Sequence, residues 1–170
     1  MNAKLIGAVF ILLASGGVGY ILASGYRKEL RYLHQMSHAL EIMAWELQYR
    51  LIPLPDLCRS AANVCTHGMN RLFLQFAKEL DDQVFPDAEQ CMHVVMEQIG
   101  DLPKSSVKII HMLGSFLGKY DLSGQLQGLD AVQLACRNMI QGLEKDKDIR
   151  IRNYQTLGLC AGAAIVIALI

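Results

Sequence analysis

Two long apolar runs lie near opposite ends of this chain, and they limit what it can fold into. Residues 5–23 and 156–170 contain no charged side chain. A membrane-spanning helix needs roughly 20 apolar residues, and about 17 is the practical minimum. The first run meets this length, and the second meets it when Tyr154 and Gln155 are counted as interface residues. The sequence therefore predicts transmembrane helices at 4–24 and 154–170.

A cleaved signal peptide is the alternative for the first run, because small residues suited to cleavage occur at 14–16 and 23–25. The apolar region of a signal peptide is usually roughly 7–15 residues long and follows a positively charged segment. Here the run is longer, and Lys4 is the only basic side chain before it. We therefore favour an uncleaved transmembrane helix.

Basic residues beside the two runs predict how the chain is oriented. Three follow the first run and four precede the second: Arg27, Lys28, Arg31, Lys145, Lys147, Arg150 and Arg152. Such residues concentrate on the cytoplasmic side of membrane proteins. We expect residues 27–153 in the cytoplasm and both termini across the membrane. Five cysteines without a framework spacing agree with a reducing compartment.

Between the runs, apolar residues recur at intervals of three and four, which is the helical period. The clearest stripe is Leu33, Met36, Leu40, Met43 and Leu47. Prolines and glycines then divide the chain into helices, because proline disfavours helical angles in the residue before it and glycine often ends a helix. The first predicted helix ends near Leu51, and the last begins near Ser123. Four helices are predicted between them, at about 55–66, 69–83, 86–100 and 103–120. The fold class is therefore all-α, with a cytosolic bundle of about six helices over 27–153.

The stretch "LGSFLGKYDLSGQ", residues 113–125, has the residue types of a phosphate-binding loop. A P-loop requires four residues between its glycines and a hydroxyl residue directly after its lysine. Only three residues separate Gly114 from Gly118, and Tyr120 follows Lys119. The preceding segment also has a helical period instead of the required strand. We interpret the stretch as a helix end, a turn and a new helix.

Small residues at intervals of four predict faces for close helix packing. Gly114 and Gly118 are one helical turn apart, so a second helix backbone could approach there. In the first apolar run, small residues occur at every fourth position, at Ser15, Gly19 and Ala23. In the second run, Gly158 and Gly162 form a GxxxG pair. Such patterns permit close packing of helices in lipid.

Two Cys-x-His pairs suggest a metal site, formed by Cys65, His67, Cys91 and His93, because all four are good zinc ligands. Residues two apart on a helix point about 200° away from each other. Such a pair can chelate only where the chain is not helical. We therefore expect no metal or cofactor and treat the four residues as ordinary buried or helix-end side chains.

The sequence contains no motif for catalysis or for nucleic-acid binding. No serine or cysteine stands in a recognisable nucleophile motif. The net charge is zero, which gives no electrostatic reason to expect nucleic acid. We expect a protein that is not an enzyme.

Acidic residues are concentrated between Lys78 and Lys104, where no lysine or arginine occurs. The seven acids are Glu79, Asp81, Asp82, Asp87, Glu89, Glu97 and Asp101. One interpretation is an ordinary solvated face. The other is a docking surface for a basic cytosolic partner, with the charge speeding and orienting association.

Taken together, the chain resembles the stage III sporulation protein AB family of endospore-forming bacteria. Four stretches carry the resemblance: "KLIGAVFILLAS", "ELQYRLIPLPDLCRSA", "LGSFLGKYDLSGQ" and "YQTLGLCAGAAIVIALI". The family is similar to the cytoplasmic helical domain of the inner-membrane platform proteins of type II secretion and type IV pili.

The resemblance implies a membrane component of the channel joining mother cell and forespore. Its implied partners are other proteins of the same operon, including a secretion-type ATPase, and homo-oligomer formation is left open. The implied location is the mother-cell membrane, with the central domain facing the cytoplasm. It implies no catalytic residues. The alternative function is a small membrane-bound metal-binding sensor or enzyme that uses Cys65, His67, Cys91 and His93.

Overall fold

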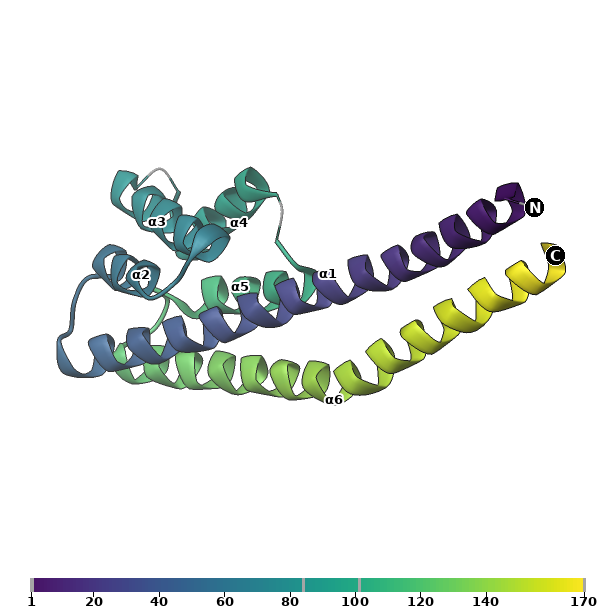
Figure 1. The fold of residues 1–170 in the computed structure, drawn as a ribbon. Helices are drawn as coiled ribbons and strands as arrows, with labels where there is room; N and C mark the ends of the chain where they lie inside the picture. Colours follow the sequence, from purple (N-terminus) through teal and green to yellow (C-terminus); the bar gives the residue numbers. More distant parts are fainter. Residues whose placement is uncertain (1, 84, 101, 170) are drawn as a thin grey trace. The chain divides into compact units, whose positions relative to one another are not determined.

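The structure, a computed structural model, describes the backbone of residues 2–83, 85–100 and 102–169, and the side chains of 24–83, 85–100, 102–145 and 156. Every secondary-structure element within these ranges is a helix (Figure 1). The helices are α1 (Asn2–Tyr49), α2 (Leu54–Asn63), α3 (His67–Asp82), α4 (Ala88–Ile99), α5 (Lys104–Phe116) and α6 (Leu122–Leu169). The prediction of an all-α fold with about six helices is confirmed.

The chain divides into two compact units. The central domain is Glu29–Gln141, and the second unit combines Met1–Lys28 with Gly142–Ile170. Within the second unit, the Tyr26 hydroxyl donates a hydrogen bond to the Leu143 carbonyl.

Within the described part of the chain, none of the helices combines the length and the hydrophobicity that a membrane span requires. The side chains of the two predicted transmembrane runs lie almost entirely outside the described residues. This also applies to the predicted packing residues Ser15, Gly19, Gly158 and Gly162.

Proline and glycine mark several helix ends as the sequence predicted, and an aspartate caps one helix. Pro53 precedes α2 and Pro103 precedes α5, positions where a missing N–H costs little. The Asp87 side chain caps α4 by accepting a hydrogen bond from the Gln90 backbone N–H at 2.8 Å. Gly100 ends the same helix with a φ of 67°, which glycine adopts readily.

The end of α5 differs from the prediction. We expected this helix to continue to about Tyr120, with Gly118 in its interior, but it ends at Phe116. Leu117 has an extended backbone, and Gly118 has a φ of 75°, which a right-handed helix cannot include. Gly118 therefore belongs to a turn, where its conformational freedom redirects the chain toward α6.

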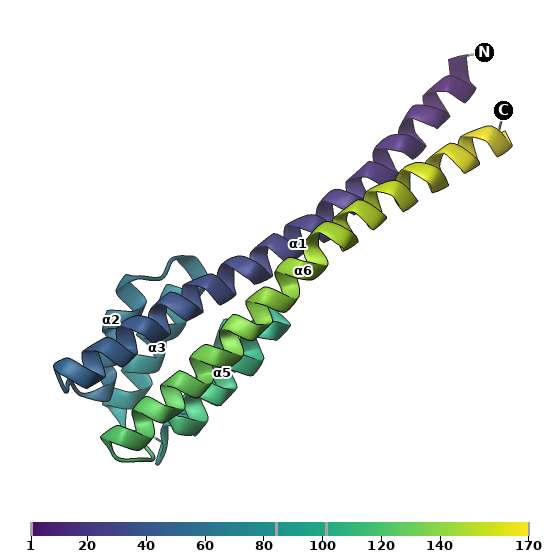
Figure 2. The same cartoon turned by 90° about the horizontal axis from the view of Figure 1, so that it is seen from below.

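The core of the central domain lies between the α1–α6 pair and the four short helices. Figures 1 and 2 show the later part of α1 beside the first part of α6, with α2–α5 covering one face of the pair. The predicted stripe of α1 is buried, from Leu33 through Leu47. Among the short helices, α2 packs on α3, α3 on α4, and α4 on α5. Phe73 and Phe76 from α3 are the largest fully buried side chains.

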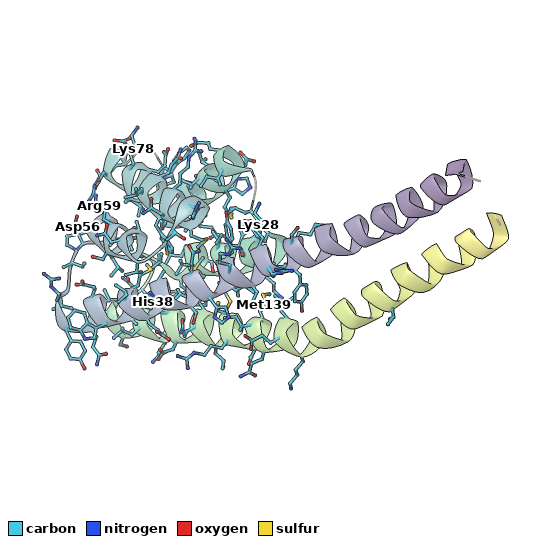
Figure 3. The ribbon with its side chains drawn as sticks, in the orientation of Figure 1. Lys28, His38, Asp56, Arg59, Lys78 and Met139 are labelled. Atoms are coloured by element: carbon cyan, nitrogen blue, oxygen red, sulfur yellow. The ribbon has the colours of Figure 1, made fainter. Side chains whose placement is uncertain are left out.

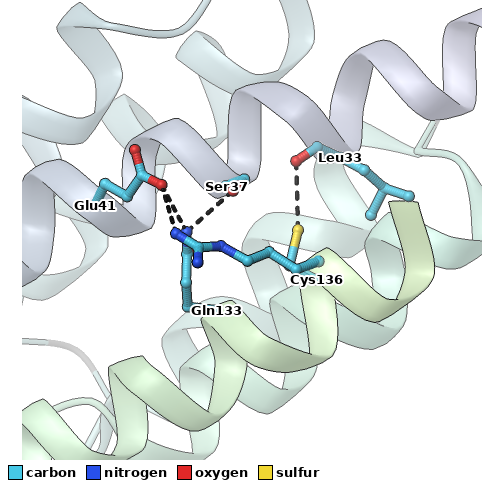
Figure 4. A network of polar contacts seen from close by, with 6 residues as sticks. Leu33, Ser37, Glu41, Gln133 and Cys136 are labelled. Carbon is cyan, nitrogen blue, oxygen red and sulfur yellow. Dashed lines mark hydrogen bonds and ion pairs between the residues drawn. The ribbon is translucent and has the colours of Figure 1, made fainter. Parts of the chain in front are cut away.

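A polar network fixes the antiparallel register of α1 and α6 (Figure 4). Gln133 Nε2 donates to Ser37 Oγ and to Glu41 Oε1, each at 3.0 Å. Arg137 forms an ion pair with the same Glu41 carboxylate at 3.0 Å. Beside it, the Cys136 thiol donates to the Leu33 carbonyl at 3.3 Å. Because Arg137 and Glu41 are exposed, this ion pair contributes at most about 1 kcal/mol, and the network mainly selects one register.

Two buried glycines allow close helix contacts. A Cβ placed on Gly114 would lie 3.0 Å from Met92 Cβ, so α5 approaches α4 closely at this point. A Cβ on Gly128 would lie 2.9 Å from both Cβ and Cγ of Phe116, where α6 meets α5. Gly114 belongs to the predicted packing pair, whereas Gly128 was not predicted as a packing residue.

Candidate partner-docking surface

The chain reversal between α3 and α4 brings most of the acidic residues together. Glu79, Asp81 and Asp82 occupy the last turn of α3, and Asp87 and Glu89 begin α4 after the reversal. The Cys91 thiol of α4 approaches the Glu79 carbonyl at 3.9 Å, which places the two helix ends side by side. The α3–α4 acidic surface is defined by five residues: Glu79, Asp81, Asp82, Asp87 and Glu89.

The remaining two predicted acids do not join this surface. Glu97 lies two turns further along α4, where its carboxylate is 3.6 Å from His93 Nδ1. Asp101 lies outside the described residues.

Two carboxylates of the α3–α4 acidic surface are already paired with basic side chains. Arg59 of α2 contacts Asp81 and also Asp56, at 2.7 Å from the latter. Lys119 contacts Glu89 at 2.5 Å. The hydrogen bond that Lys119 donates to Glu89 raises the pKa of Lys119, and the hydrogen bonds that Arg59 donates to Asp56 and Asp81 raise the pKa of Arg59. Both cations therefore keep their charge at neutral pH.

The other carboxylates form no ion pair with a basic side chain in the described part of the chain, although the Lys119 charge also acts on Asp87. Asp87 is used as the cap of α4. Glu79 and Asp82 form no ion pair with any residue whose side chain is described, and Lys78, one turn before Asp82, forms none either. Figure 3 shows Lys78, Arg59 and Asp56 along one edge of the domain. The surface thus keeps a negative charge after its internal pairs are counted.

A hollow of about 410 Å³ opens beside these acids. Its walls come from the first residue of α2, the end of α3, the reversal, the start of α4 and the turn after α5. The lining residues are Leu54, Leu80, Gln83, Phe85, Pro86, Asp87, Ala88, Cys91, Leu117, Gly118 and Lys119. The stretch that resembled a P-loop therefore supplies one wall of a mainly apolar cavity.

The four candidate metal ligands do not converge. Cys65 lies after α2, with its thiol 3.7 Å from the Gln35 carbonyl, and His67 begins α3. On α4, Cys91 is buried while His93 is exposed, with its ring 6.0 Å from that of His111. Among side chains that the structure describes, no three His, Cys, Asp or Glu lie close enough to hold a metal ion.

Burial also makes the candidate thiols poor ligands. Desolvation raises the pKa of Cys65 to about 11, and desolvation followed by the nearby Glu79 charge raises the pKa of Cys91. Metal coordination requires the thiolate, so these shifts oppose it. Nothing in the described geometry favours the metal-binding alternative.

An exposed apolar end of the α1–α6 pair was not predicted from the sequence. Trp45 and Tyr49 are one turn apart on α1, with ring centroids 5.7 Å apart, and both are exposed. Counting from the Ser37–Gln133 contact along antiparallel helices places Tyr49 level with the start of α6. Tyr120, Leu122 and Leu51 are exposed in that region of the chain. Trp45 and Tyr49 lie outside the apolar stripe of α1, and this position in the sequence pattern could have predicted that they are exposed.

Comparison with known proteins decides the family. The sequence model of the stage III sporulation protein AB family matches residues 4–170. The chain belongs to this family. Stage III sporulation protein AB of Bacillus subtilis (strain 168) is 26% identical over 172 residues, which cover 98% of each chain.

A solved structure of a stage III sporulation protein AB supports the same fold. It matches with a TM-score of 0.64 at 20% identity, over 72% of this chain and 98% of the solved one. This family member therefore shares its helical architecture with a known relative. The resemblance based on the four sequence stretches is confirmed.

Proposed function

We propose that this family member is a non-enzymatic scaffold of the channel complex between mother cell and forespore. In this proposal the two apolar runs anchor the chain in the mother-cell membrane, and the central domain faces the cytoplasm. The family match supports a role in stage III of sporulation. The basic residues beside the runs support the orientation.

The observation that carries the docking role is the unbalanced charge of the α3–α4 acidic surface. Glu79 and Asp82 gain no stabilising ion pair within the described part of the chain, and Asp82 is exposed. Uncompensated surface charge of one sign speeds and orients association with a partner of opposite sign. The partner in this proposal is the secretion-type ATPase of the same operon, presenting a basic surface.

The buried cysteines support a scaffold over a catalyst. Cys58, Cys65, Cys91 and Cys136 are buried, and desolvation is the largest cause that raises each thiol pKa. A reactive cysteine needs a lowered pKa and access to solvent. These four side chains therefore suit packing.

Site-specific photo-crosslinking tests the docking role. A photoreactive residue replaces Gln90, which is exposed on the first turn of α4, and crosslinks to the ATPase are measured in sporulating cells. The double variant Glu79→Gln/Asp82→Asn should weaken the crosslink, because each lost surface charge contributes about 0.2–1 kcal/mol to a contact. A matched control, Glu97→Gln/Asp130→Asn, removes the same charges elsewhere and should leave the crosslink unchanged.

Two results would contradict the proposal. An equal crosslink yield from the test and control variants would show that the α3–α4 acidic surface does not dock the ATPase. The second result is that the chain with all its acidic residues intact gives no crosslink to the ATPase, whether the photoreactive residue is at Gln90 or on α5 or α6. This result would remove the ATPase as the partner.

A further inference from the structure

We propose that the hollow beside the α3–α4 acidic surface receives one large apolar side chain from a basic segment of a partner protein. This inference rests on the proposed docking function and names the chemistry that would be recognised there. The partner segment has a leucine or phenylalanine with lysine or arginine on both sides.

The lining of the hollow favours an apolar guest. Its floor includes Ala88 and Leu117, which are almost completely buried, and the Cys91 thiol, whose pKa is raised by desolvation. Leu80 and Phe85 in the walls are only half-buried. A guest side chain would remove these partly exposed apolar surfaces from water, which is favourable in proportion to the area covered.

The hollow is large enough to accept one large apolar side chain together with part of its flanking backbone. Its volume is about 410 Å³, which lies within the roughly 300–1,000 Å³ of sites that hold small molecules. Gly118 contributes no side chain to the lining.

The charges around the hollow favour basic residues on both sides of the apolar side chain in the partner segment. Lys119, in the lining, is neutralised by Glu89, and Arg59, further along the edge, is neutralised by Asp81. Glu79 and Asp82, at the neighbouring end of α3, form no ion pair with any described side chain, and Asp87 in the lining shares the Lys119 charge with Glu89. An anionic small molecule, an anionic lipid or a nucleic acid would be repelled by these carboxylates. A basic protein segment gains from each of them.

Direct binding of defined peptides tests the proposal. The full chain in detergent micelles is titrated with three fluorescein-labelled peptides, and binding is followed by fluorescence anisotropy. The first peptide has one leucine between two lysine pairs, the second has alanine in place of the leucine, and the third has glutamates in place of the lysines. We expect the leucine peptide to bind at least about tenfold more tightly than the alanine peptide, from the side-chain area buried. The glutamate peptide should bind more weakly than either.

Variants of the hollow locate the binding site. Phe85→Ala removes one wall and should weaken the leucine peptide about tenfold. Leu80→Trp fills the hollow and should weaken it similarly, which keeps the test informative if Phe85→Ala fails to fold. Leu74→Ala is the matched control, because Leu74 is exposed on the same helix but does not line the hollow. Circular dichroism verifies the helical content of each variant.

Equal binding of the leucine and alanine peptides would overturn the inference, as would leucine-peptide binding that Leu80→Trp leaves unchanged. These failures are separable from failure of the proposed function. If the ATPase crosslink requires Glu79 and Asp82 while the peptides show no leucine preference, docking stands and the hollow is unused. If the leucine preference holds without an ATPase crosslink, the hollow binds a basic segment of another protein.

Discussion

Replacing Gly128 by alanine tests the close approach of α5 and α6 at this position. Gly128 is buried, and a Cβ at this position would lie 2.9 Å from both Cβ and Cγ of Phe116. Phe116 Cβ is fixed by the α5 backbone, so a rotamer change cannot move it away. The helix backbones must separate by a few tenths of an ångström. Gly142→Ala is the matched control on the same helix, because no described atom beyond the neighbouring backbone of α6 lies within 4 Å of the added Cβ.

Two opposing effects set the expected magnitude. Alanine is about 1 kcal/mol more favourable than glycine in a helix interior, and this gain applies to both variants. Overpacking a close contact typically costs about 1–3 kcal/mol, and this loss applies to Gly128→Ala alone. We therefore expect Gly142→Ala to stabilise by about 0.5–1 kcal/mol. Gly128→Ala should be less stable than Gly142→Ala by about 2 kcal/mol.

Chemical denaturation of the full chain, followed by far-UV circular dichroism, measures the difference between the two free energies of unfolding. Gly114→Ala should fall between the two variants, since its Cβ would lie 3.0 Å from Met92 Cβ. Equal free energies for Gly128→Ala and Gly142→Ala, within about 0.5 kcal/mol, would refute the argument that close approach of α5 and α6 requires glycine.

Two further predictions concern a helix cap and the buried thiols. Asp87→Ala should destabilise by about 1 kcal/mol because Asp87 caps α4, whereas Thr66→Ala should change little because Thr66 makes no capping hydrogen bond; equal effects in denaturation would contradict this. The pKa of Cys65 and of Cys136 is about 11 in the folded chain against 9.0 as the ordinary value, mainly through desolvation. The protonated thiols therefore make their full contribution to the free energy of unfolding below pH 9. This contribution is lost as the pH rises toward 11, by up to about 1.4 kcal/mol per pH unit for each thiol. Cys136→Ala should reduce this slope in pH-dependent denaturation, and an unchanged slope would contradict the assignment.

Helix positions could be predicted because their causes are local. The spacing of Leu33 through Leu47 marks the buried side of α1, and proline or glycine stands at the start of α2, the end of α4 and the start of α5. The end of α5 was the exception, since nothing local distinguishes Gly118 in a turn from Gly118 in a helix. That outcome depends on how the chain must bend to bring α6 back beside α1.

The candidate site was only partly predictable. Charge counting along the sequence identified the acidic residues, and their membership in one segment is a property of the sequence alone. The sequence alone could not predict which carboxylates lack an ion pair. Arg59 and Lys119 reach Asp81 and Glu89 from positions 22 and 30 residues away in the chain. The hollow likewise combines walls from α2, α3, α4 and the turn after α5.

The sequence by itself thus determined the helical class, most helix ends, the family and the acidic segment, because periodicity, backbone restrictions and composition act over a few neighbouring residues. Only the tertiary structure decided which charges are neutralised, where Gly128 must remain glycine and where an apolar hollow opens beside acids. Each of these depends on distances between side chains that are far apart in the chain, and those distances are set when the helices pack around their shared core.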